Sequence, residues 1–217
     1  MKIAICTPTR EVSLARHTDA MIALSQALSA EGHTPVFHRQ TGCALIEHAR
    51  SALATAAHEW GADVQLFIDD DVTPTYPLQV VQMAEHASRL ESIVAAPTLI
   101  GGGTRFNTTF LEPNPFHPRR LVKSADCGMG CTAIARSVFD AIRHHSSMDQ
   151  VMVVEGQPHV WPFFRSILGD GVWMGEDTSF VERAKQALGA SHIWADTGCV
   201  TEHWGMRPWN VLETARP

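Results

Sequence analysis

The feature that most constrains the fold is an alternation of short apolar runs with longer segments of helical periodicity from residue 1 to 97. The apolar runs predict strands at Lys2–Cys6, Pro35–His38, Val64–Ile68 and Ser92–Ala96. Between them, helical spacing predicts helices from about Ser13 to Glu31, from Leu45 to Trp60 and from about Pro74 to Leu90. This alternation is typical of α/β proteins. We therefore expect an α/β fold with a doubly wound, mostly parallel sheet and helices on both faces.

The second half of the chain is less regular. Residues 97–123 are rich in glycine and proline and predict loops. Later segments predict short strands at Leu121–Ser124 and Thr132–Ala135, a short helix at Arg136–Arg143, and final strands at His192–Ala195 and Cys199–Glu202. Another helix begins near Glu176 and ends before Gly189, and its spacing turns Phe180, Val181, Ala184 and Leu188 inward.

Length and composition limit the possible classes of protein. A chain of 217 residues fits one domain better than two, and 45% apolar residues are enough for a sizeable core. The net charge of −6 (17 basic against 23 acidic residues) argues against broad electrostatic binding of nucleic acid. Five cysteines do not indicate a disulfide framework. With no apolar run of about 18 residues and no signal peptide, we expect a cytoplasmic protein.

The first candidate site is the acidic triplet Asp69–Asp71, which directly follows the buried strand predicted at Val64–Ile68. Adjacent carboxylates repel one another unless a cation or hydrogen-bond donors hold them. Open α/β sheets bind ligands at the carboxyl ends of their strands. Oxygen ligands suit Mg²⁺ or Mn²⁺, ions that bridge the phosphates of a nucleotide. The alternative is a solvated acidic turn before Pro74.

Two further candidates lie later in the chain. Glu176 and Asp177 begin an amphipathic helix, where they either complement the helix dipole or supply a general base. His203 follows a predicted strand, and a lone histidine is more often structural than a metal ligand. Trp161 and Trp173 add aromatic bulk before Glu176, where they either pack in the core or stack on a sugar or a base.

Taken together and in this order, these elements resemble a known family. A strand ending in an acidic triplet, the segment Cys127-Gly128-Met129-Gly130, Gly175-Glu176-Asp177 leading a helix, and a strand ending in His203 are similar to nucleotide-sugar-dependent glycosyltransferases of the GT-A fold. The likeness is to the family 2-like branch, including compact single-domain bacterial and phage members. It implies one GT-A domain over 1–217, with a nucleotide-binding half at 1–97, an acceptor and catalytic half at 98–205 and a tail at 206–217.

The resemblance also implies roles for individual residues. Asp177 is the usual base of inverting members, with Glu176 beside it in the catalytic pair. The metal, Mn²⁺ or Mg²⁺, is assigned to Asp69, Asp71 and His203. The donor, with a UDP-sugar favoured, is assigned to Thr7, Pro8, Arg10, Arg50, Asp69, Asp70, Gly128 and Gly130. The family's Arg-Asn is Arg50-Ser51 in this chain.

The implied activity is metal-dependent transfer of a sugar from a nucleotide sugar to a hydroxyl acceptor, with inversion. The alternatives are a nucleotidyltransferase acting on sugar phosphates and a non-catalytic protein that binds nucleotide sugars. A nucleotidyltransferase is expected to have a glycine-rich phosphate loop after the first strand, and Thr7–Arg10 contains no glycine. The acceptor stays open among a glycan, a lipid, a protein and a modified nucleic acid base. The basic run His117–Arg120, with Lys123, either contacts an anionic acceptor such as a nucleic acid or forms a solvated loop.

Overall fold

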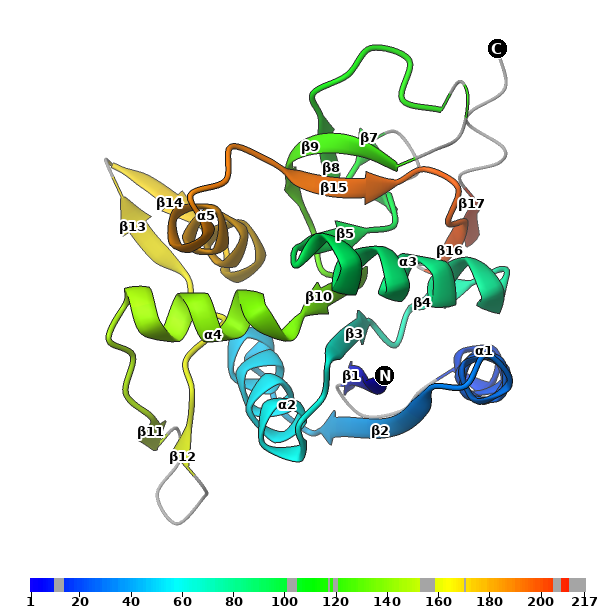
Figure 1. Ribbon diagram of the computed structural model, residues 1–217, viewed down its shortest axis with the longest axis horizontal. Helices are drawn as coiled ribbons and strands as arrows, with labels where there is room; N and C mark the ends of the chain where they lie inside the picture. The colour runs from blue at the N-terminus through cyan, green and yellow to red at the C-terminus, as the bar shows by residue number, and fades with distance from the viewer. Residues whose placement is uncertain are drawn as a thin grey trace.

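The fold is described from a computed structural model that covers residues 1–9, 14–100, 105–116, 118, 121–152, 159–169, 171–204 and 208–210. Its main sheet has eight strands in the order β2-β1-β3-β10-β5-β15-β9-β8 (Figure 1). Their bounds are β1 Lys2–Thr9, β2 Thr34–Thr41, β3 Val64–Ile68, β5 Ile93–Ala95, β8 Thr108–Phe110, β9 Leu121–Cys127, β10 Cys131–Ala135 and β15 Ile193–Asp196. The helices are α1 Ala15–Ala30, α2 Ile46–Trp60, α3 Pro77–Leu90, α4 Arg136–His145 and α5 Glu176–Leu188.

The main sheet is mixed. Strands β2, β1 and β3 are parallel to one another, and β15 is parallel to β5. Strand β10 is antiparallel to both β3 and β5, and β9 is antiparallel to both β15 and β8. Most strands of the sheet therefore run in one direction, as expected, with β10 and β9 running against them. An apolar run carries no information about strand direction, so the sequence pattern could not reveal these two reversals.

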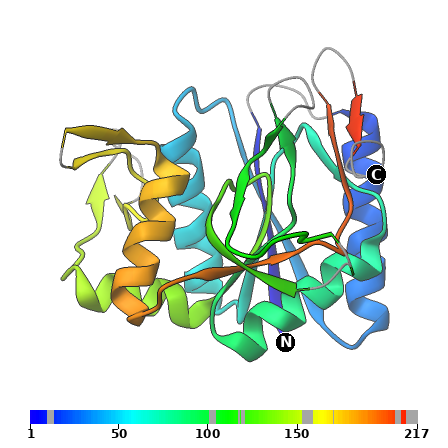
Figure 2. The same ribbon diagram turned by 90° about the horizontal axis from the view of Figure 1, so that it is seen from above.

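Helices cover both faces of the sheet, as expected, and form two cores (Figures 1 and 2). Alternate residues of a strand point to opposite faces. In β1, Ala4 and Cys6 pack on the side of α2, α4 and α5, whereas Ile3 and Ile5 pack on the side of α1 and α3. All four side chains are fully buried. The continuous apolar run at the start of the chain thus serves two cores.

Most predicted elements are confirmed, with shifted ends. Strand β1 continues through Pro8 to Thr9, because β3 pairs with β1 only as far as Cys6 and beyond that point Pro8 has a ladder neighbour on the β2 side alone. The turn into α3 holds an extra short strand, β4 (Val72–Pro74). Leu188 was expected to point inward, but it lies in the last turn of α5 and is 36% exposed.

Smaller sheets lie around the main one. Strand β4 pairs with β16 (Thr201–Trp204), which also pairs with β17 (Pro208–Asn210). Three two-stranded pairs complete the described structure. They are β6 (Leu99–Ile100) with β7 (Arg105–Phe106), β11 (Val151–Met152) with β12 (His159–Val160), and β13 (Ile167–Gly169) with β14 (Val172–Met174).

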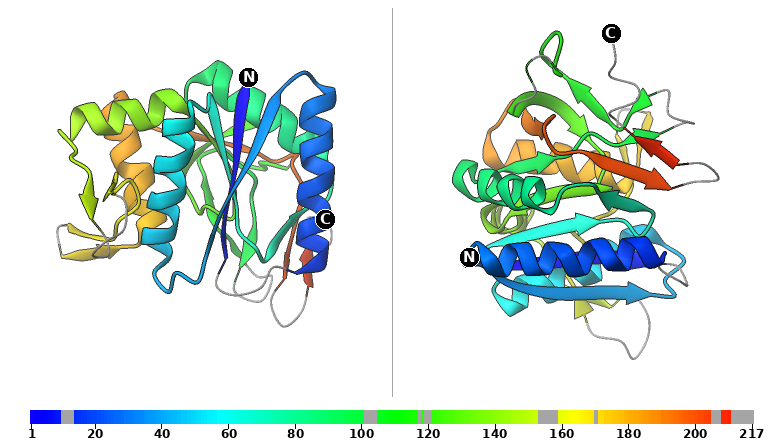
Figure 3. Two further views of the ribbon diagram at one scale, coloured as in Figure 1. Left: turned by 90° about the horizontal axis from the view of Figure 1, so that it is seen from below. Right: turned by 90° about the vertical axis from the view of Figure 1, so that its right-hand side faces the viewer.

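The carboxyl ends of β1 and β3 meet at one edge of the sheet, because the two strands are adjacent and parallel. Helices α2 and α5 both begin at this edge, beside the β13–β14 hairpin (Figures 2 and 3). The segments singled out from the sequence therefore converge at one end of the molecule.

Candidate functional site

A pocket of about 580 Å³ opens at the carboxyl ends of β1 and β3. It receives residues from β1, from the loop before α2 and α2 itself, from the turn after β3, and from the start of α5. The lining residues are Pro8, Thr9, Cys43, Ala44, Ile46, Ala49, Arg50, Asp69, Asp70, Asp71, Glu176 and Asp177. Both acidic motifs predicted from the sequence thus face the same cavity.

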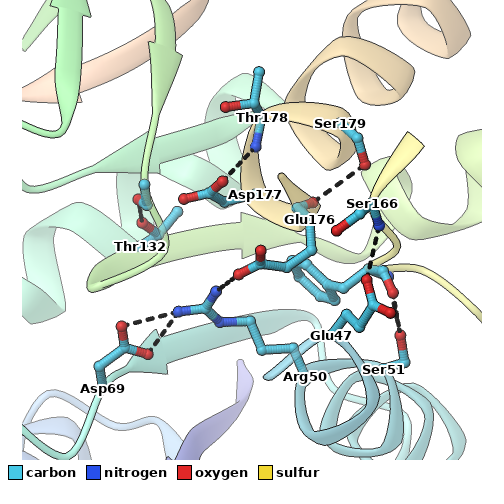
Figure 4. A network of polar contacts seen from close by, with 12 residues as sticks. Glu47, Arg50, Ser51, Asp69, Thr132, Ser166, Glu176, Asp177, Thr178 and Ser179 are labelled. Atoms are coloured by element: carbon cyan, nitrogen blue, oxygen red, sulfur yellow. Dashed lines mark hydrogen bonds and ion pairs between the residues drawn. The ribbon is translucent and has the colours of Figure 1, made fainter. Parts of the chain in front are cut away.

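Arg50 joins the two acidic motifs (Figure 4). Its side chain is 6% exposed, and its Nη2 donates to both carboxylate oxygens of Asp69 at 2.9 Å. Its Nη1 donates to Oε1 of Glu176. A buried ion pair is held firmly only where geometry and additional hydrogen bonds are good, and a planar guanidinium with a forked set of donors meets that demand. Arg50 therefore fixes the start of α5 against the end of β3.

Helix α2 also anchors the chain segment that leads into α5. Glu47 Oε2 accepts the backbone N–H of Ser166 at 2.8 Å (Figure 4). The hydroxyl of Ser51 donates to the Phe164 carbonyl at 2.9 Å and accepts the N–H of the same residue at 3.0 Å. Glu47, Arg50 and Ser51 are spaced so that one helix end makes all these contacts. Ser51 thus has a structural role.

Burial and charge act in opposite directions on this network. Burial tends to lower the pKa of Arg50, but the carboxylates of Asp69 and Glu176 outweigh it and raise that pKa above its usual value. Burial raises the pKa of Asp69 and of Glu176, and the guanidinium opposes both increases. The charge of Asp177 raises the pKa of Glu176 further. Arg50 stays cationic, and the two carboxyls depend on it for stabilisation.

Asp177 faces the same pocket but makes no contact with Arg50 among the described hydrogen bonds. Its Oδ1 accepts the N–H of Thr178 at 2.7 Å, a local bond at the start of α5. The Thr178 hydroxyl in turn donates to Oδ2 of Asp126 at 3.2 Å. Burial, with a contribution from Asp177, raises the pKa of Asp126. No sequence motif marks Asp126. Only the approach of β9 to α5 places it near the start of α5, which carries Glu176 and Asp177.

His203 lies beside Asp71 because of a strand register. Strand β16 pairs antiparallel with β4, which sets His203 opposite Val72. His203 Nε2 is 3.2 Å from Asp71 Oδ2, and Nδ1 is 2.7 Å from the Leu99 carbonyl oxygen. The bond with Asp71 raises the pKa of His203, although burial opposes the rise. The sequence prediction that these two residues share a site is consistent with this geometry.

The chemistry of this pair fits a divalent cation. A histidine that donates Nδ1–H to a carbonyl presents an unprotonated Nε2 in its neutral form, the arrangement usual for metal-binding imidazoles. Asp71 supplies a carboxylate whose side chain is 47% exposed. Asp69 instead gives both oxygens to Arg50. Within the described ranges, no group of three or more histidine, cysteine, aspartate or glutamate side chains is assembled for a metal.

The other residues predicted to contact the nucleotide-sugar donor fall into three groups. Pro8 and Asp70 line the pocket, whereas Arg10 lies outside the described residues. Thr7 is buried and is not among the lining residues. Gly128 and Gly130 do not line it either.

The two glycines have roles within the protein itself. A Cβ at Gly128 would lie 2.8 Å from Nδ2 of Asn107, so glycine at this position, just after β9, leaves room for the Asn107 side chain between β7 and β8. The carbonyl of Gly130 accepts the N–H of Asp69 at 3.0 Å. The segment that contains these glycines therefore holds the backbone at the start of the acidic turn by a hydrogen bond.

Sequence reasoning missed one wall of the pocket. Cys43, Ala44 and Ile46 line it, from the β2–α2 connection and the first turn of α2. Small and apolar residues in a connecting loop carry no motif, so only the tertiary structure could assign them to the site.

No protein-family model matches the sequence, and no curated protein matches it either. In the part of the chain that the structure describes, none of the helices has the length and apolarity needed to cross a membrane. The fold and site define a mixed-sheet α/β protein with an acidic pocket at the carboxyl edge of its parallel strands, and these residues carry the functional argument.

Proposed function

We propose that the protein is a metal-dependent glycosyltransferase that moves a sugar from a nucleotide-sugar donor to a hydroxyl acceptor. One observation carries this proposal: Arg50 joins Asp69 to Glu176, so that two acidic motifs more than a hundred positions apart face a single pocket. Motifs that the resemblance assigned to donor and acceptor chemistry thus belong to one cavity.

The pocket suits a nucleotide sugar in position and size. It lies where open α/β sheets commonly bind nucleotides, at the carboxyl ends of parallel strands. Its volume of about 580 Å³ is within the range of small-molecule sites. Pro8 and Thr9 at the end of β1 provide the wall proposed for the nucleobase. A UDP-sugar is the first donor to test.

Asp71 and His203 are the residues proposed to hold Mn²⁺ or Mg²⁺. When bound there, the cation would supply Lewis-acid stabilisation for the diphosphate leaving group. Asp69 would contribute indirectly: as the partner of Arg50, it keeps the acidic turn in place.

Asp177 is the proposed general base. Its carboxylate takes the proton of the acceptor hydroxyl while the acceptor oxygen forms a bond to the anomeric carbon. The bond from that carbon to the diphosphate oxygen breaks, and its electron pair leaves with the diphosphate. Attack opposite to the leaving group inverts the configuration. Glu176 is the positioning partner, because its contact with Arg50 holds the first turn of α5 at the pocket wall.

The test combines nucleotide binding with turnover. Purified protein is titrated calorimetrically with UDP with and without Mn²⁺, and then incubated with UDP-, GDP-, CDP- and dTDP-sugars to measure donor hydrolysis. We expect Mn²⁺-dependent binding of one nucleotide and slow hydrolysis of its sugar. Asp19→Asn, on the exposed face of α1, serves as the control that leaves both unchanged.

Two results would count against the proposal. Absence of both metal-dependent nucleotide binding and hydrolysis would overturn it. Metal-dependent binding without hydrolysis or transfer to any acceptor would favour a non-catalytic nucleotide-sugar-binding protein.

A further inference from the structure

The β13–β14 hairpin presents an apolar surface beside the proposed base. Its strands pair Leu168 with Trp173 and Gly169 with Val172, and a connection of two residues joins them. Gly171 in this connection has φ of +75°, a conformation that favours glycine. The hairpin is separate from the main sheet and leads directly into Glu176 (Figures 1 and 2).

Three side chains of this hairpin are more exposed than any other large apolar side chain in the described part of the chain. Leu168 is 69% exposed, Val172 61% and Trp173 71%. Because Leu168 and Trp173 are direct cross-strand neighbours, they share one face of the hairpin. Grouped apolar exposure of this kind marks a surface that binds something.

Trp161 provides a contrast within the same segment. It is only partly exposed, and the guanidinium carbon of Arg143 lies 3.8 Å from the centre of its ring. Trp161 thus has a partner within the protein, which fits the packing alternative considered from the sequence. Trp173 is exposed, so core packing does not explain it.

Two contacts just before β13 hold the base of the hairpin in place. On one side, the N–H of Ser166 donates to Glu47 on α2. On the other, the hydroxyl of Ser179 on α5 donates to the carbonyl of Arg165. Short anchored strands reduce the entropy lost when a ligand binds. The base of the hairpin is therefore held between α2 and α5, whose first turns line the pocket.

Exposed apolar side chains also lie at the start of α2. Leu45 is 53% exposed and Ile46 is 41% exposed at the start of α2, and Ile46 also lines the pocket. The contact between Glu47 and Ser166 brings this end of α2 to the base of the hairpin. Ile46 thus connects this end of α2 to the pocket that Asp177 also lines.

Charge at the rim decides which occupant fits. The nearby charged side chains have both signs: Glu47, Glu176 and Asp177 are carboxylates, and Arg50 and Arg165 are guanidinium groups. An uncharged ligand rich in hydroxyls can hydrogen-bond to both kinds of group. A hydrocarbon chain would cover the carboxylates without hydrogen bonds, which is unfavourable. A neutral sugar ring satisfies both features, because its C–H face packs on an indole and its hydroxyls donate to carboxylates.

We propose that Trp173, with Leu168 beside it, binds the ring of a neutral carbohydrate acceptor and directs a hydroxyl of that sugar towards Asp177. This inference rests on the proposed function, because it assigns the acceptor of the same site. It selects a glycan from the acceptor classes that the sequence left open.

Binding is tested separately from turnover. Wild-type protein, Trp173→Ala, Trp173→Phe and the control Phe37→Ala are titrated with maltotriose, cellotriose and chitotriose, using saturation-transfer difference NMR. Phe37 is a matched exposed aromatic residue, 46% exposed on the edge strand β2. We expect at least one trisaccharide to bind the wild type and Phe37→Ala equally, about tenfold more weakly to Trp173→Ala, and with intermediate affinity to Trp173→Phe.

The outcomes separate this inference from the proposed function. If transfer to a trisaccharide occurs, Trp173→Ala should raise the acceptor KM about tenfold and change kcat much less. Equal KM values for wild type and Trp173→Ala would overturn the role of Trp173 in acceptor binding and leave the glycosyltransferase proposal standing. If the wild type binds a trisaccharide, Trp173→Ala does not, and neither protein binds UDP, the role of Trp173 would be supported and the proposed function contradicted. Binding of phosphatidylcholine vesicles or of oligothymidylate through Trp173, without any trisaccharide, would overturn the carbohydrate assignment.

Discussion

The two acidic motifs of the pocket are built on the same plan from different elements. One is a turn after the buried strand β3, and the other is the first turn of α5. In each motif the first acid, Asp69 or Glu176, is bound to Arg50. In each, a later acid has other surroundings: Asp71 faces His203, and Asp177 bonds to the N–H of Thr178.

This comparison shows how adjacent carboxylates can take different roles. In the first motif the Arg50 partner is the more enclosed acid: the Asp69 side chain is 24% exposed and that of Asp71 47%. In the second motif the side chain of the Arg50 partner, Glu176, is 16% exposed. An enclosed carboxylate needs a fixed counter-charge, and Arg50 supplies it. We infer that the first acid of each motif maintains the pocket and that Asp71 and Asp177 carry the chemistry.

The sharpest test of this division compares Asp177→Asn with Glu176→Gln. Asp177→Asn keeps an oxygen that can accept the Thr178 N–H and removes the base, so transfer should fall about a thousandfold while Mn²⁺-dependent UDP binding is retained. Glu176→Gln should reduce thermal stability more than Asp177→Asn does, because Arg50 loses a charged partner. Single-turnover transfer assays and calorimetry measure the two effects. Full transfer activity in Asp177→Asn would remove it as the base.

Removing Arg50 should disturb both motifs together. Arg50→Gln leaves two enclosed carboxylates without their cation, and we expect a loss of about 3 kcal/mol in the free energy of unfolding. Arg50→Lys keeps the charge but not the forked geometry, so its loss should be smaller. Urea unfolding measures both variants, with the exposed Arg89→Gln as the control. Equal stability of Arg50→Gln and wild type would show that the two motifs are held by other contacts.

Asp71 should affect the cation more than the fold. Asp71→Asn is expected to weaken Mn²⁺-dependent UDP binding at least about tenfold, since a neutral amide is a poorer ligand than a carboxylate. Its melting temperature should stay close to that of the wild type, because the Asp71 side chain is half-exposed. Calorimetric titration at fixed Mn²⁺ gives the affinity, with Asp19→Asn alongside. If Asp69→Asn rather than Asp71→Asn produced this loss, the assignment within the first motif would be reversed.

The smallest expected effect concerns Asp126, the carboxyl next to the second motif. Burial raises its pKa above the ordinary 3.8, so just above that pH the native state holds a proton that the unfolded chain has released. Stability from this group is therefore lost as pH rises through this window. Asp126→Asn should flatten the pH dependence of the melting temperature between about pH 4 and 7, relative to Asp19→Asn. Identical profiles for wild type and Asp126→Asn would show that Asp126 is not desolvated.

The sequence predicted the local elements because their causes are local. The run Val64–Ile68 is entirely apolar, and the strand occupies those residues. Helix α2 ends where Gly61 adopts φ of +84°, a conformation that glycine accepts without strain. The acidic turn and the start of α5 were likewise visible as short, contiguous patterns.

Contacts between distant segments were beyond sequence patterns. The insertion of β10 between β3 and β5, against their direction, depends on how the second half of the chain returns to the sheet. The approach of Asp126 to Thr178 depends on the same return. Neither contact produces a residue spacing in the sequence from which it could be predicted.

The sequence by itself determined which residues could carry charge and chemistry: an acidic turn after a buried strand, an acid pair at the start of a helix, and a late histidine. Only the tertiary structure decided how these residues divide their roles. It placed Arg50 between Asp69 and Glu176, set His203 beside Asp71 through the β4–β16 register, and left Trp173 exposed on the β13–β14 hairpin. The physical reason is that enclosure and counter-charge determine the role of a carboxylate, and both are set by segments far apart in the chain.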